Sequence, residues 1–279
     1  EIYQCDWSSD VCSSDLQEVH DELHARCLVL DDGRTRLAIV ICDVLGVHRS
    51  LSLETRRLIR EATGIPPENV VMAGTHTHSA GTALGASRLA YDQTLDDYQR
   101  FLARRVTDAV VLAAGRLRPA EIASGSVDVP DHVFNRRWHM REGTAPASPF
   151  GKVERVRMNP PAGSPNLVEP AGPTDPGVSF VALREPGGRL ISVFAAYSLH
   201  YVGGVAGRAI SADYFGVFCE ELARLAGPAG DGPPFVALLA NGTSGDINNI
   251  NFRTPEPRRP AYEKMRLRSE EHTSELQSH

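Results

Sequence analysis

The sequence has few cysteines, no long apolar run and none of three common glycine-rich loop motifs of nucleotide-binding proteins and serine hydrolases. Three of its five cysteines, Cys27, Cys42 and Cys219, lie in the interior, far apart and odd in number. That spacing gives neither a disulfide framework nor a zinc-finger pattern. No apolar stretch approaches the roughly 20 residues of a membrane-spanning helix. Phosphate-loop, Gly-x-Ser-x-Gly and Gly-x-Gly-x-x-Gly motifs are also missing, which argues against nucleotide-binding and serine-elbow classes.

The two ends of the chain match translated sequencing adapter. Residues 268–279 correspond to a common short-read adapter translated in frame, and residues 6–16 correspond to the complementary read. We therefore expect residues 1–16 and 268–279 to be adapter-derived, and residues 17–267 to be part of one native domain. These ends hold seven of the 35 acidic residues but one of the 29 basic residues, so the interior is neutral. A neutral interior gives no indication of nucleic-acid binding.

Apolar runs of strand length alternate with stretches of helical periodicity. The pattern predicts strands at 37–42, 70–73, 120–127 and 235–240, a hairpin at 178–184 and 190–196, and helices at 50–63, 95–117 and 214–225. The mixed order favours an α/β fold, a layered sandwich with a mixed, partly antiparallel β-sheet. Residues 130–176 show no period and are long for a loop, so they are either functional or contain elements that the pattern does not reveal.

Polar side chains recur immediately after the predicted strands, at Asp43, His76, His78, His200 and Asp246. Ligands gather at the carboxyl ends of strands in α/β sheets. In an extended segment, His76 and His78 would leave the same face, which suits two ligands of one metal or a ligand with an acid/base partner. A structural or exposed pair of histidines fits the same spacing. A third histidine after another strand favours a metal, because neutral imidazole suits zinc.

The segment 241–249 is rich in glycine and short polar residues and follows a buried strand. Its backbone N–H groups are candidates for binding an anion or an oxyanion. An ordinary turn explains the same composition equally well.

As an ordered set, these segments resemble the neutral/alkaline ceramidases. The resemblance covers most of residues 17–267 and is weakest between 140 and 176. The matching segments are His24-Ala-Arg-Cys-Leu-Val-Leu-Asp31, Val40-Ile-Cys-Asp43, Gly74-Thr-His-Thr-His-Ser79, Phe194-Ala-Ala-Tyr-Ser-Leu-His200, Ile210-Ser-Ala-Asp213 and Thr243-Ser-Gly-Asp246.

The resemblance implies a zinc-dependent hydrolase that cleaves the N-acyl amide of ceramide, a sphingolipid, with a metal-activated water. By position, His76 and His200 would ligate Zn²⁺, and His78 would transfer a proton or orient the substrate. Arg136, in the pair Asn135-Arg136, would contact the substrate or an oxyanion. Asp246 lies in the segment that resembles the family's catalytic loop.

The chain departs from the family at one catalytic position and lacks two further ligands. Asn248 stands where the family has its functional serine, and it is a candidate hydrogen-bond donor to an oxyanion. The family's remaining zinc ligands, a glutamate and a tyrosine, would lie beyond Leu267. Two alternatives therefore stay open: a non-catalytic ligand-binding domain on the same scaffold, and a hydrolase of a different small substrate.

Overall fold

The computed structural model describes residues 18–148, 150–228, 232–257 and 259–269. The expected adapter residues 1–16 and 270–279 lie outside these ranges, whereas residues 268 and 269 are described and are helical, as are residues 263–267. Within the described ranges, no helix is both long enough and apolar enough to cross a bilayer.

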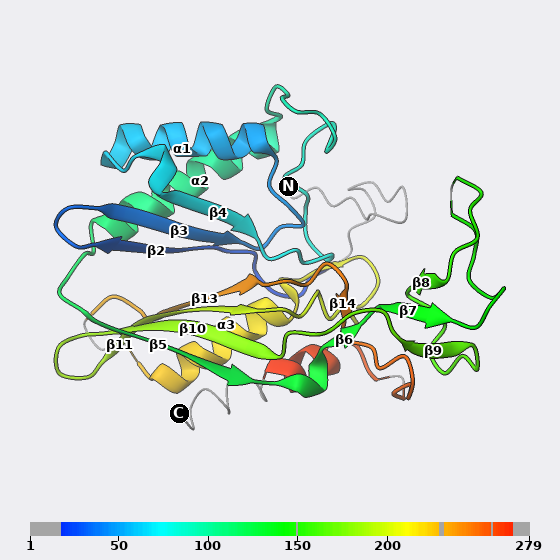
Figure 1. Cartoon of the computed structure of the whole chain (residues 1–279). Coiled ribbons are helices and arrows are strands. Elements are labelled where there is room, and N and C mark those ends of the chain that lie inside the picture. The colour runs from blue at the N-terminus through cyan, green and yellow to red at the C-terminus, as the bar shows by residue number, and fades with distance from the viewer. Residues whose placement is uncertain (1–17, 149, 229–231, 258, 270–279) are drawn as a thin grey trace.

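The first sheet carries both N-terminal helices on one face. Strands β2 (Ala25–Asp31) and β3 (Arg36–Cys42) are antiparallel, and β4 (Val70–Gly74) pairs with β3 in parallel. Helices α1 (Arg49–Thr63) and α2 (Asp97–Ala114) lie together on this sheet, as Figure 1 shows. Their apolar sides pack against β3 in a continuous core, which explains the helical spacing of their apolar residues.

The second sheet has four strands and carries the third helix. Strands β5 (Glu121–Asp128), β10 (Gly177–Arg184) and β11 (Leu190–Tyr197) are antiparallel neighbours, and β13 (Val236–Asn241) pairs in parallel with β11. Helix α3 (Asp213–Ala226) packs on the outer face of this sheet (Figure 1). Both sheets are therefore mixed, because each contains antiparallel and parallel pairs.

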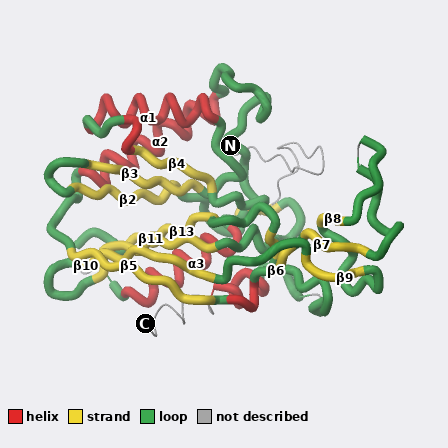
Figure 2. Tube along the Cα trace, in the orientation of Figure 1, coloured by secondary structure: helices red, strands yellow, loops and turns green. Residues whose placement is uncertain are grey.

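The two sheets face each other through an apolar layer. Leu28 and Ile41 of the first sheet meet Leu183 and Leu238 of the second, and all four side chains are buried. The layers run helix, sheet, sheet, helix, which can be followed in Figure 2. This arrangement confirms the predicted α/β sandwich with mixed, partly antiparallel sheets.

The stretch 130–176 contains short elements that the sequence pattern did not reveal. It holds the 3₁₀ turn η3 (Pro130–His132) and strands β6 (Phe134–Asn135), β7 (Arg137–Met140), β8 (Val156–Met158) and β9 (Leu167–Pro170). Strand β7 is the middle strand of a sheet with β8 and β9, which projects beside the sandwich in Figure 1. Strands of two to four residues are too short to show a period.

Short strand pairs connect distant segments of the chain. Strand β1 (Glu18–Val19) pairs in parallel with β12 (Ala209–Ile210), and β14 (Ile247–Asn248) pairs antiparallel with β6. The 3₁₀ turn η2 (Pro67–Asn69) leads directly into β4. The pairing of β14 with β6 brings the segment after β13 beside the Asn-Arg pair of the sequence analysis.

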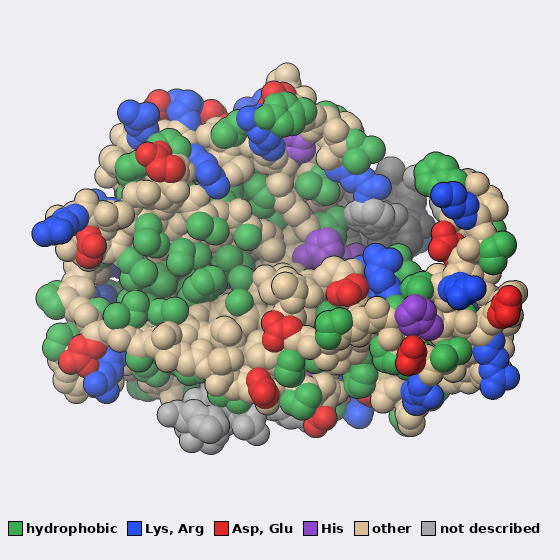
Figure 3. Space-filling model, viewed as in Figure 1, with side chains coloured by type: hydrophobic (Ala, Val, Ile, Leu, Met, Phe, Trp, Pro, Cys, Tyr) green, Lys and Arg blue, Asp and Glu red, His purple; other side chains and the backbone are tan. Residues whose placement is uncertain are grey.

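An apolar hollow of about 1070 Å³ opens between β2 and the strands β10 and β11. Leu28, Leu30, Leu183 and Ile191 are among its lining residues. Figure 3 shows apolar side chains gathered in a hollow on this face of the molecule. In the described part of the chain, none of the predicted site residues lines this hollow.

Candidate metal centre

Three histidines from two segments of the chain form a cluster. The side-chain nitrogens of His76, His78 and His200 that could bind a metal all lie within 4.8 Å of one another. The ring centroid of His76 lies 4.8 Å from that of His78 and 4.8 Å from that of His200. The structure therefore brings together the three histidines that the sequence analysis singled out.

A sharp turn after β4 places the first two histidines. The strand ends at Gly74, where a Cβ atom would lie only 2.8 Å from the carbonyl oxygen of Val44. His76 then adopts a φ of 68°, a left-handed conformation that residues other than glycine rarely take. The segment is therefore not extended, and the expected i, i+2 alternation is not what brings the two rings together. Their edge-to-face packing follows from the turn.

Backbone carbonyls fix the orientation of two of the rings. The Nδ1 atom of His76 lies 2.7 Å from the carbonyl oxygen of Leu45, and the Nδ1 of His200 lies 2.9 Å from that of Ser244. Because a carbonyl only accepts, each Nδ1 carries the proton and donates. Each Nε2 atom then carries a lone pair and no proton, which is the usual arrangement of metal-binding histidines.

The third ring is held by stacking on an aromatic neighbour. The ring of His78 lies on that of Tyr201, with centroids 3.8 Å apart and planes 14° apart. Its Nε2 atom faces the Nε2 of His76 at 3.3 Å. Sequence reasoning missed Tyr201, although it directly follows His200. Its position next to a candidate ligand was the available signal.

The electrostatic environment keeps His200 neutral. Burial lowers the pKa of His200 to about 4, the hydrogen bond with Ser244 raises it in part, and the charges of His76 and Arg136 lower it further. At neutral pH the imidazole is therefore uncharged, as metal coordination requires.

The segment 241–249 contributes carbonyl oxygens to the site and uses several of its amides internally. The N–H groups of Gly242, Thr243, Ser244 and Ile247 donate to acceptors within the fold. These four amides are therefore not available to the anion that the composition suggested. The Gly245 carbonyl instead accepts from the Arg136 guanidinium through Nε, at 3.1 Å, and through Nη2, at 2.5 Å.

The two predicted site residues of this segment, Asp246 and Asn248, each contact an asparagine from elsewhere in the chain. The Asp246 carboxylate accepts from the Asn135 side chain at 3.1 Å, and the Asp246 carbonyl accepts from the Arg136 backbone N–H. The Asn248 side chain donates to that of Asn159 at 3.4 Å. Asp246 is therefore tied to the Asn-Arg pair, and Asn248 is turned toward Asn159.

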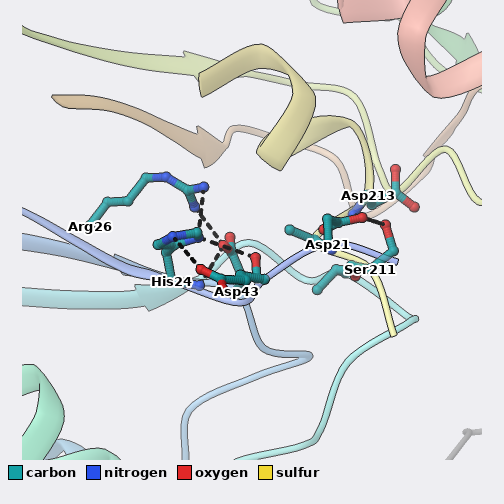
Figure 4. A network of polar contacts seen from close by, with 9 residues as sticks. Asp21, His24, Arg26, Asp43, Ser211 and Asp213 are labelled. Atoms are coloured by element: carbon teal, nitrogen blue, oxygen red, sulfur yellow. Dashed lines mark hydrogen bonds and ion pairs between the residues drawn. The ribbon is translucent and has the colours of Figure 1, made fainter. Parts of the chain in front are cut away.

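Asp43, the first polar residue after a strand, belongs to a separate buried ion pair. Its carboxylate accepts from Arg26 at 2.5 Å and from the His24 backbone N–H at 3.0 Å. Figure 4 shows this contact from close by. Asp43 therefore stabilises the end of β3, and breaking such a pair typically costs about 3–5 kcal/mol.

The donor atoms are of the kind that binds zinc, and one pair of them has the spacing of two tetrahedral ligands. Two nitrogen ligands at the usual zinc distance of about 2.0–2.1 Å, with a tetrahedral angle between them, lie about 3.3 Å apart. The Nε2 atoms of His76 and His78 have this separation. Three neutral imidazoles are also a common catalytic zinc ligand set, because they leave one position for water or substrate.

The fold and this cluster define an α/β sandwich protein with a candidate metal centre at the carboxyl ends of its strands. The same sandwich is found in neutral ceramidases. The chain superposes on a structure described as a ceramidase complexed with C2, with a TM-score of 0.67 and 19% sequence identity. It also superposes on the neutral ceramidase from Pseudomonas aeruginosa, with a TM-score of 0.65 and 21% identity.

Each superposition covers 94% of this chain but 39% of the other. The chain therefore spans about two fifths of the length of these proteins. No protein-family profile matches the sequence. At this level of identity, the likeness shows the fold.

Proposed function

We propose that the chain is the metal-binding part of a zinc-dependent hydrolase that cleaves N-acyl amide bonds. The observation that supports this proposal most directly is the cluster of His76, His78 and His200 within a ceramidase-like sandwich. The expected substrate class is a lipid amide or a smaller N-acyl compound.

In this proposal all three histidines hold the metal. His76 and His200 present Nε2 atoms whose rings are fixed by backbone carbonyls. The 3.3 Å separation between the Nε2 atoms of His76 and His78 favours His78 as a third ligand over the proton-transfer role that the resemblance implies. A zinc ion bound there supplies an electrophile that polarises a carbonyl group and acidifies water.

Arg136 is the candidate group for binding the substrate carbonyl. Its bonds to Gly245 use Nε and Nη2, and among the described residues no hydrogen bond engages Nη1. Burial lowers the pKa of Arg136, with a further decrease from Arg137. The guanidinium stays charged at neutral pH, so Nη1 can donate to an oxygen on which negative charge develops. Asp246 and Asn135 hold the backbone beside it.

Asn248 favours a second candidate function, a ligand-binding domain without catalysis. An asparagine cannot act as a nucleophile, and its side chain is bonded to Asn159. In this alternative, the three histidines would still bind zinc, and the domain would hold an N-acyl ligand without cleaving it.

Release of fatty acid from an N-acyl sphingosine tests the proposal. We expect the zinc-loaded full-length protein that contains this chain to release fatty acid faster than its His200→Ala variant, which loses one ligand. Equal rates for the two proteins would contradict hydrolysis. Retained binding of the amide with no release would support the non-catalytic alternative, and Asn248→Ser then tests whether the loop alone prevents turnover.

A further inference from the structure

We propose that the segment 211–213, just before and at the start of α3, positions the metal centre by holding its two histidine segments together. This inference rests on the proposed function, because it concerns the same three histidines. The segment has no ligand of its own in the cluster. It acts through hydrogen bonds to residues that flank His78 and that follow His200.

The first set of contacts reaches the segment around His78. The Thr77 hydroxyl donates to the Ser211 carbonyl oxygen at 2.9 Å, and the Ser211 backbone N–H donates to the Ser79 carbonyl at 2.8 Å. Thr77 and Ser79 flank His78 on both sides, and Thr77 and Ser211 are fully buried. Residue 211 is therefore bonded on one side of His78 to the Thr77 hydroxyl and on the other side to the Ser79 backbone carbonyl.

The second set of contacts reaches the segment after His200. The Asp213 carboxylate accepts from the backbone N–H of Val202 at 2.9 Å and from that of Gly203 at 2.8 Å. It also accepts from its neighbour Tyr214. Backbone amides thus satisfy a carboxylate that is wholly buried, which would otherwise be costly.

The segment is itself fixed by a second carboxylate. Asp21 accepts from the Ser211 hydroxyl at 2.6 Å and from the Ala212 backbone N–H. The Ser211 hydroxyl oxygen in turn accepts from the Asp213 backbone N–H at 3.0 Å. Figure 4 shows Asp21, Ser211 and Asp213 close together at this point. The segment is therefore held on one side while it bonds the histidine segments on the other.

This geometry matters because the two histidine segments belong to different sheets. His78 follows β4 of the first sheet, and His200 follows β11 of the second. The segment 211–213 bonds to both, so it sets their relative position. Groups that hydrogen-bond directly to metal ligands typically change metal affinity about 10- to 100-fold when they are lost, and we expect an effect of this size here.

Two threonines on either side of His76 provide a matched test. The Thr77 hydroxyl donates to Ser211, whereas the hydroxyl of Thr75, equally buried, has no hydrogen-bond partner among the described residues. Valine keeps the shape of either side chain and removes its hydroxyl. We therefore compare Thr77→Val with Thr75→Val in the full chain.

The measurement is the Zn²⁺ dissociation constant, obtained by competition with a chromogenic chelator. We expect Thr77→Val to weaken zinc binding about 10- to 100-fold, and Thr75→Val to change it by less than about twofold. Two-bond ¹H–¹⁵N spectra of the histidine rings should show altered zinc-induced shifts in Thr77→Val alone. Equal dissociation constants for the two variants would overturn the positioning role.

Asp213→Asn tests the second set of contacts. An asparagine amide would point its NH₂ group at a backbone N–H, so the 202–203 backbone must shift and zinc affinity should fall at least about tenfold. The control is Val110→Ala, which removes buried side-chain volume from α2, a helix that contributes no residue to the cluster. If Asp213→Asn does not fold, the threonine pair decides alone.

The outcomes separate the two proposals. A wild-type chain that binds no zinc overturns both the zinc centre and the positioning role. A wild-type chain that binds zinc, with Thr77→Val and Asp213→Asn binding it equally well, overturns the positioning role and leaves the zinc centre standing.

Discussion

Backbone and side-chain groups around the three histidines orient them by different means. Carbonyl oxygens hold the rings of His76 and His200, whereas an aromatic ring holds that of His78. A hydrogen bond fixes both the tautomer and the direction of an imidazole, while stacking fixes only its plane. The plane of the His78 ring therefore depends on the neighbouring Tyr201 side chain.

Substitution of Tyr201 should test this dependence. We expect Tyr201→Ala to weaken zinc binding by about two- to tenfold, the value of an aromatic pair. Tyr201→Phe keeps the ring and should lose less. A Phe variant that binds as weakly as the Ala variant would show that the hydroxyl, and not the stacking, matters. Chelator competition measures both.

The buried carboxyl of Asp213 gives the metal-free chain a pH-dependent stability. Burial raises its pKa from 3.8 to about 6, backbone hydrogen bonds oppose this rise, and the charge of Asp21 adds to it. As the pH rises, the Asp213 carboxyl ionises at a lower pH in the unfolded chain than in the folded chain. The contribution of this carboxyl to the stability of the fold is therefore fully present below about pH 4 and is lost as the pH rises through 6. The loss amounts to at most about 3 kcal/mol.

Thermal unfolding between pH 4 and pH 7, with a chelator present, checks whether this contribution to stability falls as the pH rises. We expect the difference in Tm between Asp213→Asn and wild type to change across this range, since the asparagine does not titrate. A constant difference at every pH would contradict a raised pKa of Asp213.

The helices are stabilised by local signals that are independent of the metal centre. At the start of α2, the Asp96 side chain accepts a hydrogen bond from the Gln99 backbone N–H. In return, the Gln99 side chain accepts one from the Asp96 backbone N–H. We expect Asp96→Ala to lower the free energy of unfolding by about 1 kcal/mol, measured by urea denaturation. Its zinc affinity should equal that of wild type, and a weaker affinity would show that α2 also acts on the centre.

The long elements were predictable from the sequence because each buries a regular apolar pattern. The run Leu37-Ala-Ile-Val-Ile-Cys42 is buried between the α1–α2 layer and the second sheet, and it forms β3. The predicted hairpin became β10 and β11 for the same reason. His76, His78 and His200 were identified because each follows such a strand.

Other features were not predictable because they depend on contacts that no local pattern records. His76 adopts its left-handed conformation two residues after Gly74, whose backbone lies against the Val44 carbonyl oxygen. Tyr201 joins the cluster only because β4 and β11 end beside each other. The strands of residues 130–176 are too short for a period and form by pairing with distant partners.

At the scale of the whole molecule, the candidate metal centre joins the two sheets. His76 and His78 extend from the first sheet and His200 from the second. A ligand that binds only the folded chain stabilises it, by about 2.7 kcal/mol at a hundredfold excess over its dissociation constant. Zinc should therefore hold the two halves of the sandwich together. The apolar hollow between the sheets lies apart from this centre.

The most direct test of the three-histidine centre is calorimetric titration of the metal-free chain with Zn²⁺. The variants His76→Ala and His200→Ala are titrated in the same way for comparison. We expect one zinc ion per wild-type chain, and affinity reduced by at least about 100-fold in each variant. A wild-type chain that takes up no zinc, or variants that bind it as tightly as wild type, would contradict a metal centre at these residues.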